Sequence, residues 1–183
     1  MARTRTLAIA LAFAISAAVS PLGAAAATKA ELNRDGVRVL NTLLKQNKAA
    51  RLLAEKARAI LVFPSITKAG FMIGGQIGDG VLLKNKKPVA YYNTVAASYG
   101  FQAGAQQFGY ALFFMNDKAL EYLDQSGGFE VGAGPSIVVV DEGMGKSMTS
   151  TTVTQDVYAF IFSQKGLMGG MGLQGSKITK LDK

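Results

Sequence analysis

The distribution of glycine constrains this chain more than any other feature. Only two of its 21 glycines, Gly23 and Gly36, come before Gly70, so the other 19 lie between Gly70 and Gly175. The residues among them are mainly β-branched and aromatic, the types that favour strands. We therefore predict an α+β fold, in which N-terminal helices pack on a mostly antiparallel, glycine-rich sheet that is strongly curved or barrel-like.

Glycines 70, 74, 78 and 80 are separated by even numbers, so in an extended strand they project from one face, opposite Phe71, Ile73 and Ile77. Residues 166–172 repeat the pattern weakly. We call this the Gly/Met face, because Met72 and Met168 belong to the same two segments. A face so bare of side chains lets another element approach closely. We expect a packed helix there, with an acyl chain as the alternative occupant.

The N-terminus has the three parts of a secretory signal peptide: arginines at 3 and 5, an apolar stretch over 7–19, and small residues up to Ala27. We predict a signal peptide over 1–27 and a single domain over 28–183. An uncleaved anchor helix is the alternative. Export predicts a periplasmic or secreted protein, and without cysteine its stability must come from packing rather than from disulfides.

The chain has no cysteine and no histidine, which excludes thiolate nucleophiles, imidazole bases and most zinc, copper or haem sites. The GKS sequence at 145–147 follows an apolar run, but its spacing does not fit a phosphate-binding loop, and we expect a glycine-rich hairpin turn. Asp141 and Glu142 are interpreted as a solvated turn, with one side of a calcium site as the alternative. We expect no enzyme activity, metal or cofactor; a carboxylate hydrolase would need two scattered acids to converge.

Local signals place the helices. Thr28 and Glu31 have the spacing of a capping box, and Leu32, Gly36, Val39, Leu40 and Leu43 would share the buried side of the helix that follows. A second helix is expected over about 48–59, with ion pairs among Arg51, Glu55 and Arg58. A short helix is expected over 117–123. Strands are expected over 70–80, 81–83, 89–98, 100–115, 129–140, 149–154 and 157–163.

Basic residues gather on the first helices and on the turn at 84–87. After loss of Arg3 and Arg5 with the signal peptide, 18 basic and 12 acidic residues remain, a net charge of +6. Such a surface attracts anionic lipid head groups. The alternatives are a merely solvated helix face and turn lysines that prevent edge pairing. The candidate lipid-binding residues are Lys29, Arg34, Arg38, Lys45, Lys48, Arg51, Lys84, Lys86 and Lys87.

Several segments, in order, resemble the SYLF domain, a lipid-binding module of bacterial envelope proteins and of the SH3-bearing yeast actin-patch protein and its animal relatives. The segments are AILVFP at 59–64, KAGF at 68–71, GGQIGDGV at 74–81, YYNT at 91–94, SYGFQAGAQ at 98–106, DKAL at 117–120 and KGL at 165–167. The resemblance covers roughly residues 28–180. It implies phospholipid or phosphoinositide binding through a basic amphipathic region, here 29–58, without catalysis.

The leading hypothesis is a non-enzymatic envelope protein that binds anionic phospholipid peripherally at the membrane surface. The alternative is an envelope structural or protein-interaction module with a protein partner or an apolar cargo on the Gly/Met face. An exported chain would meet neither actin nor nucleic acid, so neither is expected as a partner, and phosphatidylglycerol or cardiolipin is a more available lipid than a phosphoinositide.

Overall fold

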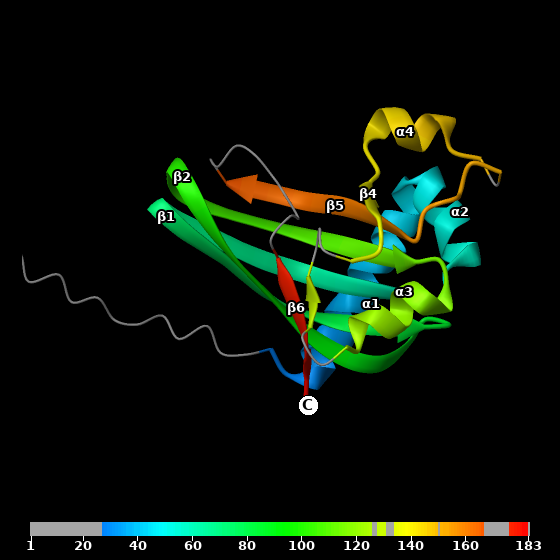
Figure 1. The fold of residues 1–183 in the computed structure, drawn as a ribbon, viewed down its shortest axis with the longest axis horizontal. Helices are drawn as coiled ribbons and strands as arrows, with labels where there is room; N and C mark the ends of the chain where they lie inside the picture. The colour runs from blue at the N-terminus through cyan, green and yellow to red at the C-terminus, as the bar shows by residue number, and fades with distance from the viewer. Residues whose placement is uncertain (1–26, 126–127, 131–133, 150, 167–175, 183) are drawn as a thin grey trace, which may run out of the picture.

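The computed structural model describes residues 27–125, 128–130, 134–149, 151–166 and 176–182 (Figure 1). The predicted signal peptide, apart from Ala27, therefore lies outside the described residues. Residues 167–172 of the second glycine-rich segment also lie outside them. The described helices are α1 (Lys29–Gln46), α2 (Lys48–Lys56), α3 (Asp117–Leu123) and α4 (Glu142–Ser147). The described strands are β1 (Ala59–Lys84), β2 (Lys87–Phe114), β3 (Phe129–Glu130), β4 (Ile137–Val139), β5 (Val157–Gly166) and β6 (Lys177–Leu181).

One long antiparallel hairpin, β1 with β2, forms the centre of the sheet. Its register runs from Ala59 opposite Phe114 to Lys84 opposite Lys87, with irregularities that include one between Phe71 and Ile73. The two strands reach together to one end of the molecule, far from the helices (Figure 1). β6 pairs with the first part of β2 and β5 with its second part, while β3 and the parallel strand β4 lie at the edges. Apart from β4, all pairings are antiparallel.

The hairpin curls so strongly that two parts of β1 touch each other. A Cβ atom on Gly80 would lie 2.7 Å from Cδ1 of Phe63 and 2.9 Å from the carbonyl oxygen of Val62. A Cβ atom on Gly78 would lie 2.7 Å from Cγ1 of Ile66. The bare face of β1 is therefore covered at Gly78 and Gly80 by the beginning of the same strand. The expectation of a helix there is wrong, because a glycine face accepts a neighbouring backbone equally well.

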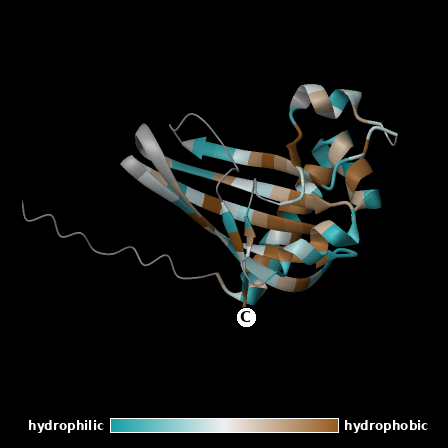
Figure 2. Cartoon of the chain, in the orientation of Figure 1, coloured by the Kyte–Doolittle hydropathy of each residue, from teal (hydrophilic) through white to brown (hydrophobic). Residues whose placement is uncertain are grey.

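Both faces of the sheet are buried near the helices. The inner face carries one hydrophobic cluster, which includes Leu61, Phe63, Tyr110 and α3 residue Leu123. The outer face carries a second cluster, which joins Val62 and its neighbours to Leu40 of α1 and Leu53 of α2. Figure 2 shows the hydrophobic residues of β1 and β2 gathered mostly in the half of the sheet next to the helices, in agreement with two buried faces there. The predicted α+β class, with N-terminal helices on a curved, mostly antiparallel sheet, is confirmed.

Two predicted segments form other structures. Residues 145–147 do not form a hairpin turn but are the last residues of the short helix α4. Asp141 caps this helix by accepting a hydrogen bond from the N–H of Met144 at 2.7 Å. Residues 149–154 are not a strand where the structure describes them, because the N–H of Thr149 donates to Oγ1 of Thr152 at 2.9 Å and closes a turn. The second helix also ends at Lys56, three residues early, so Ala59 already begins β1.

Candidate functional site

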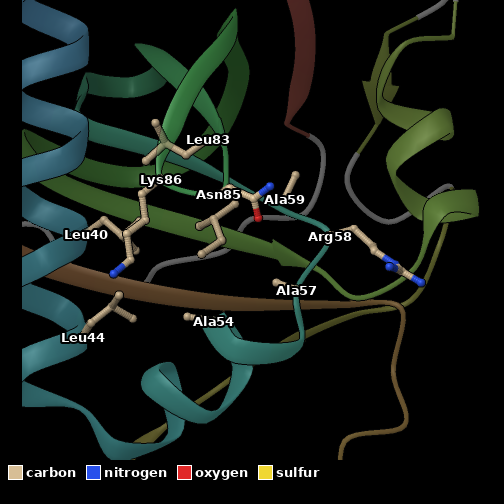
Figure 3. Close-up of a pocket in the computed structure, with 10 residues that line it drawn as sticks. Leu40, Leu44, Ala54, Ala57, Arg58, Ala59, Leu83, Asn85 and Lys86 are labelled. Atoms are coloured by element: carbon tan, nitrogen blue, oxygen red, sulfur yellow. The ribbon is translucent and has the colours of Figure 1, made fainter.

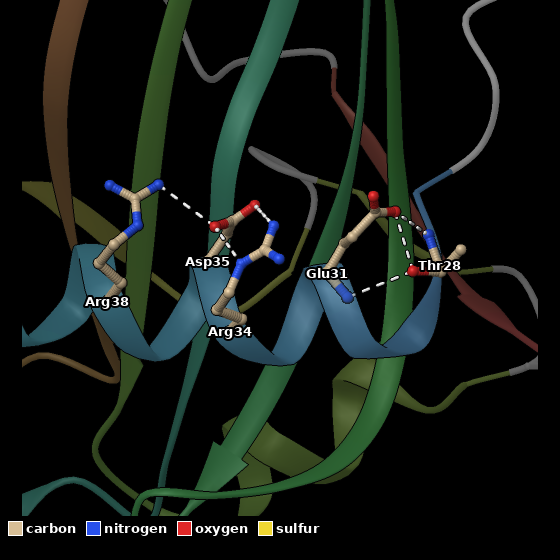
Figure 4. Close-up of polar contacts among 5 residues, drawn as sticks. All are labelled: Thr28, Glu31, Arg34, Asp35 and Arg38. Atoms are coloured by element: carbon tan, nitrogen blue, oxygen red, sulfur yellow. Dashed lines mark hydrogen bonds and ion pairs between the residues drawn. The ribbon is translucent and has the colours of Figure 1, made fainter.

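Helix α1 begins as the sequence predicts. Oγ1 of Thr28 accepts a hydrogen bond from the N–H of Glu31, and the Glu31 carboxylate accepts one from the N–H of Thr28 at 2.9 Å (Figure 4). The hydrogen bond from the Thr28 backbone lowers the pKa of Glu31, with the Thr28 hydroxyl adding to it. A Cβ atom on Gly36 would overlap Cγ1 of Val81, so the helix lies directly against the outer face of β1. Its basic residues Arg34, Arg38 and Lys45 are exposed.

The first basic residues of α1 are partly neutralised. Asp35 lies 3.3 Å from the guanidinium of Arg34 and 3.3 Å from that of Arg38 (Figure 4). The hydrogen bond from Arg34, helped by the charge of Arg34 and by Arg38, lowers the pKa of Asp35. Lys29 lies over the ring of Tyr91, 5.8 Å from its centroid. Asp35 therefore offsets one of the positive charges on this half of α1, while Lys29 keeps its charge.

At the other end of α1, Arg51 of α2 has a fixed position. Its guanidinium donates to the carbonyl oxygens of Leu44 and Lys45, both at 3.1 Å, and so satisfies two of the last carbonyls of α1. Arg58 lies 3.7 Å from Asp117 of α3. The ion pairs predicted among Arg51, Glu55 and Arg58 are therefore wrong, because both arginines have other partners and because the helix ends before Arg58.

The turn between β1 and β2 presents three lysines. Asn85 and Lys86 have φ angles of 51° and 63°, which is the left-handed conformation that two-residue hairpin turns require at both positions. Lys84 and Lys87 flank them as paired, exposed residues. Asn tolerates this conformation, whereas Lys at a position suited to glycine is strained. The side chain of Lys86 extends towards α1, between Leu40 and Leu44 (Figure 3).

An apolar pocket of about 230 Å³ lies beneath Lys86, between α1, α2 and the neighbouring ends of β1. Its lining residues are Leu40, Leu44, Ala54, Ala57, Arg58, Ala59, Ile60, Leu83, Asn85 and Lys86. Figure 3 shows Arg58 pointing away from these side chains. The pocket is thus mainly aliphatic, with its polar groups at the turn.

A wider basic groove of about 530 Å³ adjoins the apolar pocket, and Leu44, Ala54 and Lys86 line both. Its lining residues are Asn41, Leu44, Lys45, Arg51, Ala54, Glu55 and Lys86. Three are basic and one is acidic. Another hollow of about 610 Å³ beside α3 has mixed charges, including Lys118, Glu121 and Asp156.

The structure brings together three of the nine candidate residues, Lys45, Arg51 and Lys86, around the basic groove. The other six candidate residues do not line the basic groove: Lys29, Arg34, Arg38, Lys48, Lys84 and Lys87. Sequence reasoning missed the apolar pocket, because Ala54 and Ala57 have the pattern of ordinary helix residues, and only the placement of β1 beside them forms the pocket. The spacing of Leu40 and Leu44 (i, i+4) was the one available signal.

Within the described ranges, no group of three or more acidic side chains gathers closely enough to hold a metal ion. No helix in the part of the chain that the structure describes has the length and hydrophobicity needed to span a bilayer.

The described residues form a small α+β domain with a basic groove beside an apolar pocket. Residues 95–183 match the model of the Ysc84 family, which is described as Las17-binding protein actin regulator. The match confirms the resemblance to the SYLF domain family over these residues, which make up slightly less than half of the chain. Among curated proteins, none matches the chain. All nine candidate residues precede the matched segment.

Proposed function

We propose that this domain binds anionic phospholipid peripherally, with the basic groove of Lys45, Arg51 and Lys86 against the head groups. The observation that carries the proposal is the meeting of these three cations, from three different elements, above an aliphatic pocket. Among the described residues, neither Lys45 nor Lys86 lies within ion-pair distance of a carboxylate. Each basic residue near an anionic surface contributes about 1 kcal/mol, and salt screens this attraction.

The proposed setting is the bacterial envelope, after removal of a signal peptide over residues 1–27. The protein would be periplasmic or secreted and would act without catalysis. The description of the Ysc84 family names Las17 and actin, but an exported chain would not meet actin, so we propose phosphatidylglycerol or cardiolipin as the binding partner instead.

The test is co-sedimentation of residues 28–183 with phosphatidylglycerol vesicles and with neutral phosphatidylcholine vesicles, at low and high salt. We expect binding to the anionic vesicles alone, and its loss as the salt concentration rises, because screening shortens the reach of surface charges to about 3 Å at 1 M. Binding that is equal on both vesicles, or insensitive to salt, would contradict the electrostatic account. No binding to either would leave a protein partner as the better function.

A protein partner is favoured by one separate observation. Ile77 and Val95 are cross-strand partners on β1 and β2, and they are 55% and 49% exposed. Exposed apolar side chains that lie together are typical of interaction surfaces. This pair is too small to outweigh the groove, and the vesicle experiment separates the two functions.

Lys86→Gly should change stability and lipid binding in opposite directions. Glycine adopts the left-handed conformation freely, so the free energy of unfolding should rise by up to about 1 kcal/mol. Loss of the ammonium should weaken binding to phosphatidylglycerol vesicles about fivefold. Lys87→Gly is the matched control: it removes the same charge, but Lys87 lies in a strand, where glycine lowers stability. Urea denaturation and vesicle titration measure both effects, and a fall in stability for Lys86→Gly would contradict the assignment of strain.

A further inference from the structure

The apolar pocket has the size and lining for a chain of carbon atoms. Its volume of about 230 Å³ corresponds to about eight groups of the size of a water molecule or a methylene, at about 30 Å³ each. Its walls are the side chains of Leu40, Leu44, Ala54 and Ala57. A cavity with walls of this kind gives water few hydrogen-bond partners, so an apolar occupant is favoured over water.

The mouth of the apolar pocket determines what the occupant must carry. Leu44, Ala54 and Lys86 line the apolar pocket and the basic groove together, so the two form one continuous depression. A molecule with its tail in the apolar pocket would hold its other end beside Lys86, with Lys45 and Arg51 on the same groove. Charge complementarity favours an anion there. Nη1 of Arg51 is held by the carbonyl oxygens of Leu44 and Lys45, which leaves Nε and Nη2 as the pair of donors for a phosphate.

We propose that the apolar pocket receives one acyl chain of an anionic phospholipid, while the basic groove holds its phosphate. The inference rests on the proposed function and adds to it a specific site for a single lipid molecule, beyond attraction to a charged surface. Ala54 and Ala57 keep the apolar pocket open, because any larger side chain at either position would occupy it.

The test uses lysophosphatidylglycerol below its micelle concentration as the probe, in calorimetric titrations of residues 28–183. We expect one molecule bound per protein, and affinity that falls about tenfold for each two methylenes removed once the chain is short enough to lie wholly within the apolar pocket. Glycerol phosphate, which has the head group but no chain, should bind at least tenfold more weakly.

Ala57→Leu should abolish binding of the probe while leaving binding to phosphatidylglycerol vesicles within about twofold, because Ala57 lines the apolar pocket but not the basic groove, and every cation of the groove remains. Ala57→Val fills the same space with a smaller side chain and provides a second variant if Ala57→Leu does not fold. Ala30→Phe is the control, since Ala30 is exposed on the first turn of α1.

The outcomes separate this inference from the proposed function. The acyl-chain site alone would be overturned if the protein bound the vesicles but not the probe. It would also be overturned if both variants with a larger side chain in the apolar pocket bound the probe as tightly as the unchanged protein. Tighter binding of an acidic peptide than of the probe would also overturn it. Absence of binding to phosphatidylglycerol vesicles would overturn the proposed function and this inference together.

Discussion

Gly80→Val is expected to lower the free energy of unfolding by about 3 kcal/mol, near the upper end of the usual cost of overpacking a core. Added side-chain atoms at this position would meet the ring of Phe63 at 2.7 Å and the carbonyl oxygen of Val62 at 2.9 Å. Phe63 is fully buried and the carbonyl belongs to the backbone of β1, so neither can move aside easily. The curl of the hairpin would have to open.

Gly75→Val is the matched control, five residues earlier in the same strand. The nearest atom to a Cβ on Gly75 is the carbonyl oxygen of Ala96 at 3.6 Å, an ordinary contact, and Gly75 is exposed. Because valine suits an extended strand, we expect a change within about 0.5 kcal/mol. Urea denaturation of both variants gives the comparison. If both variants lost the same free energy of unfolding, the close approach of Gly80 to Phe63 and Val62 would not be the reason for glycine at this position.

Elements that depend on neighbouring residues could be predicted from the sequence. The capping box of Thr28 and Glu31 gave the start of α1, and the short helix expected over 117–123 forms as α3, where Asn116 accepts a hydrogen bond from the N–H of Ala119. The basic turn between the ends of β1 and β2 was also correct. In each case the signal and the structure lie within a few residues of each other, so local propensity decides.

Elements that depend on distant contacts could not be predicted. Residues 57–60 continue a helical pattern, but Arg58 donates its N–H to the carbonyl oxygen of Phe114, which begins the pairing of β1 with β2. β6 was missed because its strand character comes from pairing with residues 91–95, more than 80 positions earlier. Tertiary pairing overrides local preference in both places.

The same limit applies to the candidate site. The sequence offered nine basic residues as one surface, since only the fold shows that Asp35 pairs with Arg34 and Arg38. Only the fold shows that Lys86, 35 residues after Arg51, lines the same groove. A charge count predicted the kind of partner, whereas the position of the groove required the placement of β1 against α1 and α2.

Combined replacement of Lys45, Arg51 and Lys86 by glutamine should weaken binding to phosphatidylglycerol vesicles about 100-fold. The expectation follows from about 1 kcal/mol for each basic residue close to an anionic surface, or about 3 kcal/mol for the three. Arg51 also holds two carbonyls of α1, so circular dichroism must first show that the variant is folded.

Titration of phosphatidylglycerol vesicles into this variant and into a control variant is the most direct test of the proposed lipid-binding surface. The control replaces Lys118, Lys165 and Lys177 by glutamine, three exposed lysines outside the basic groove, and so has the same net charge. We predict a loss of about 100-fold for the groove variant and of only a few-fold for the control. Equal losses would contradict the account, because binding would then depend on net charge and not on the groove.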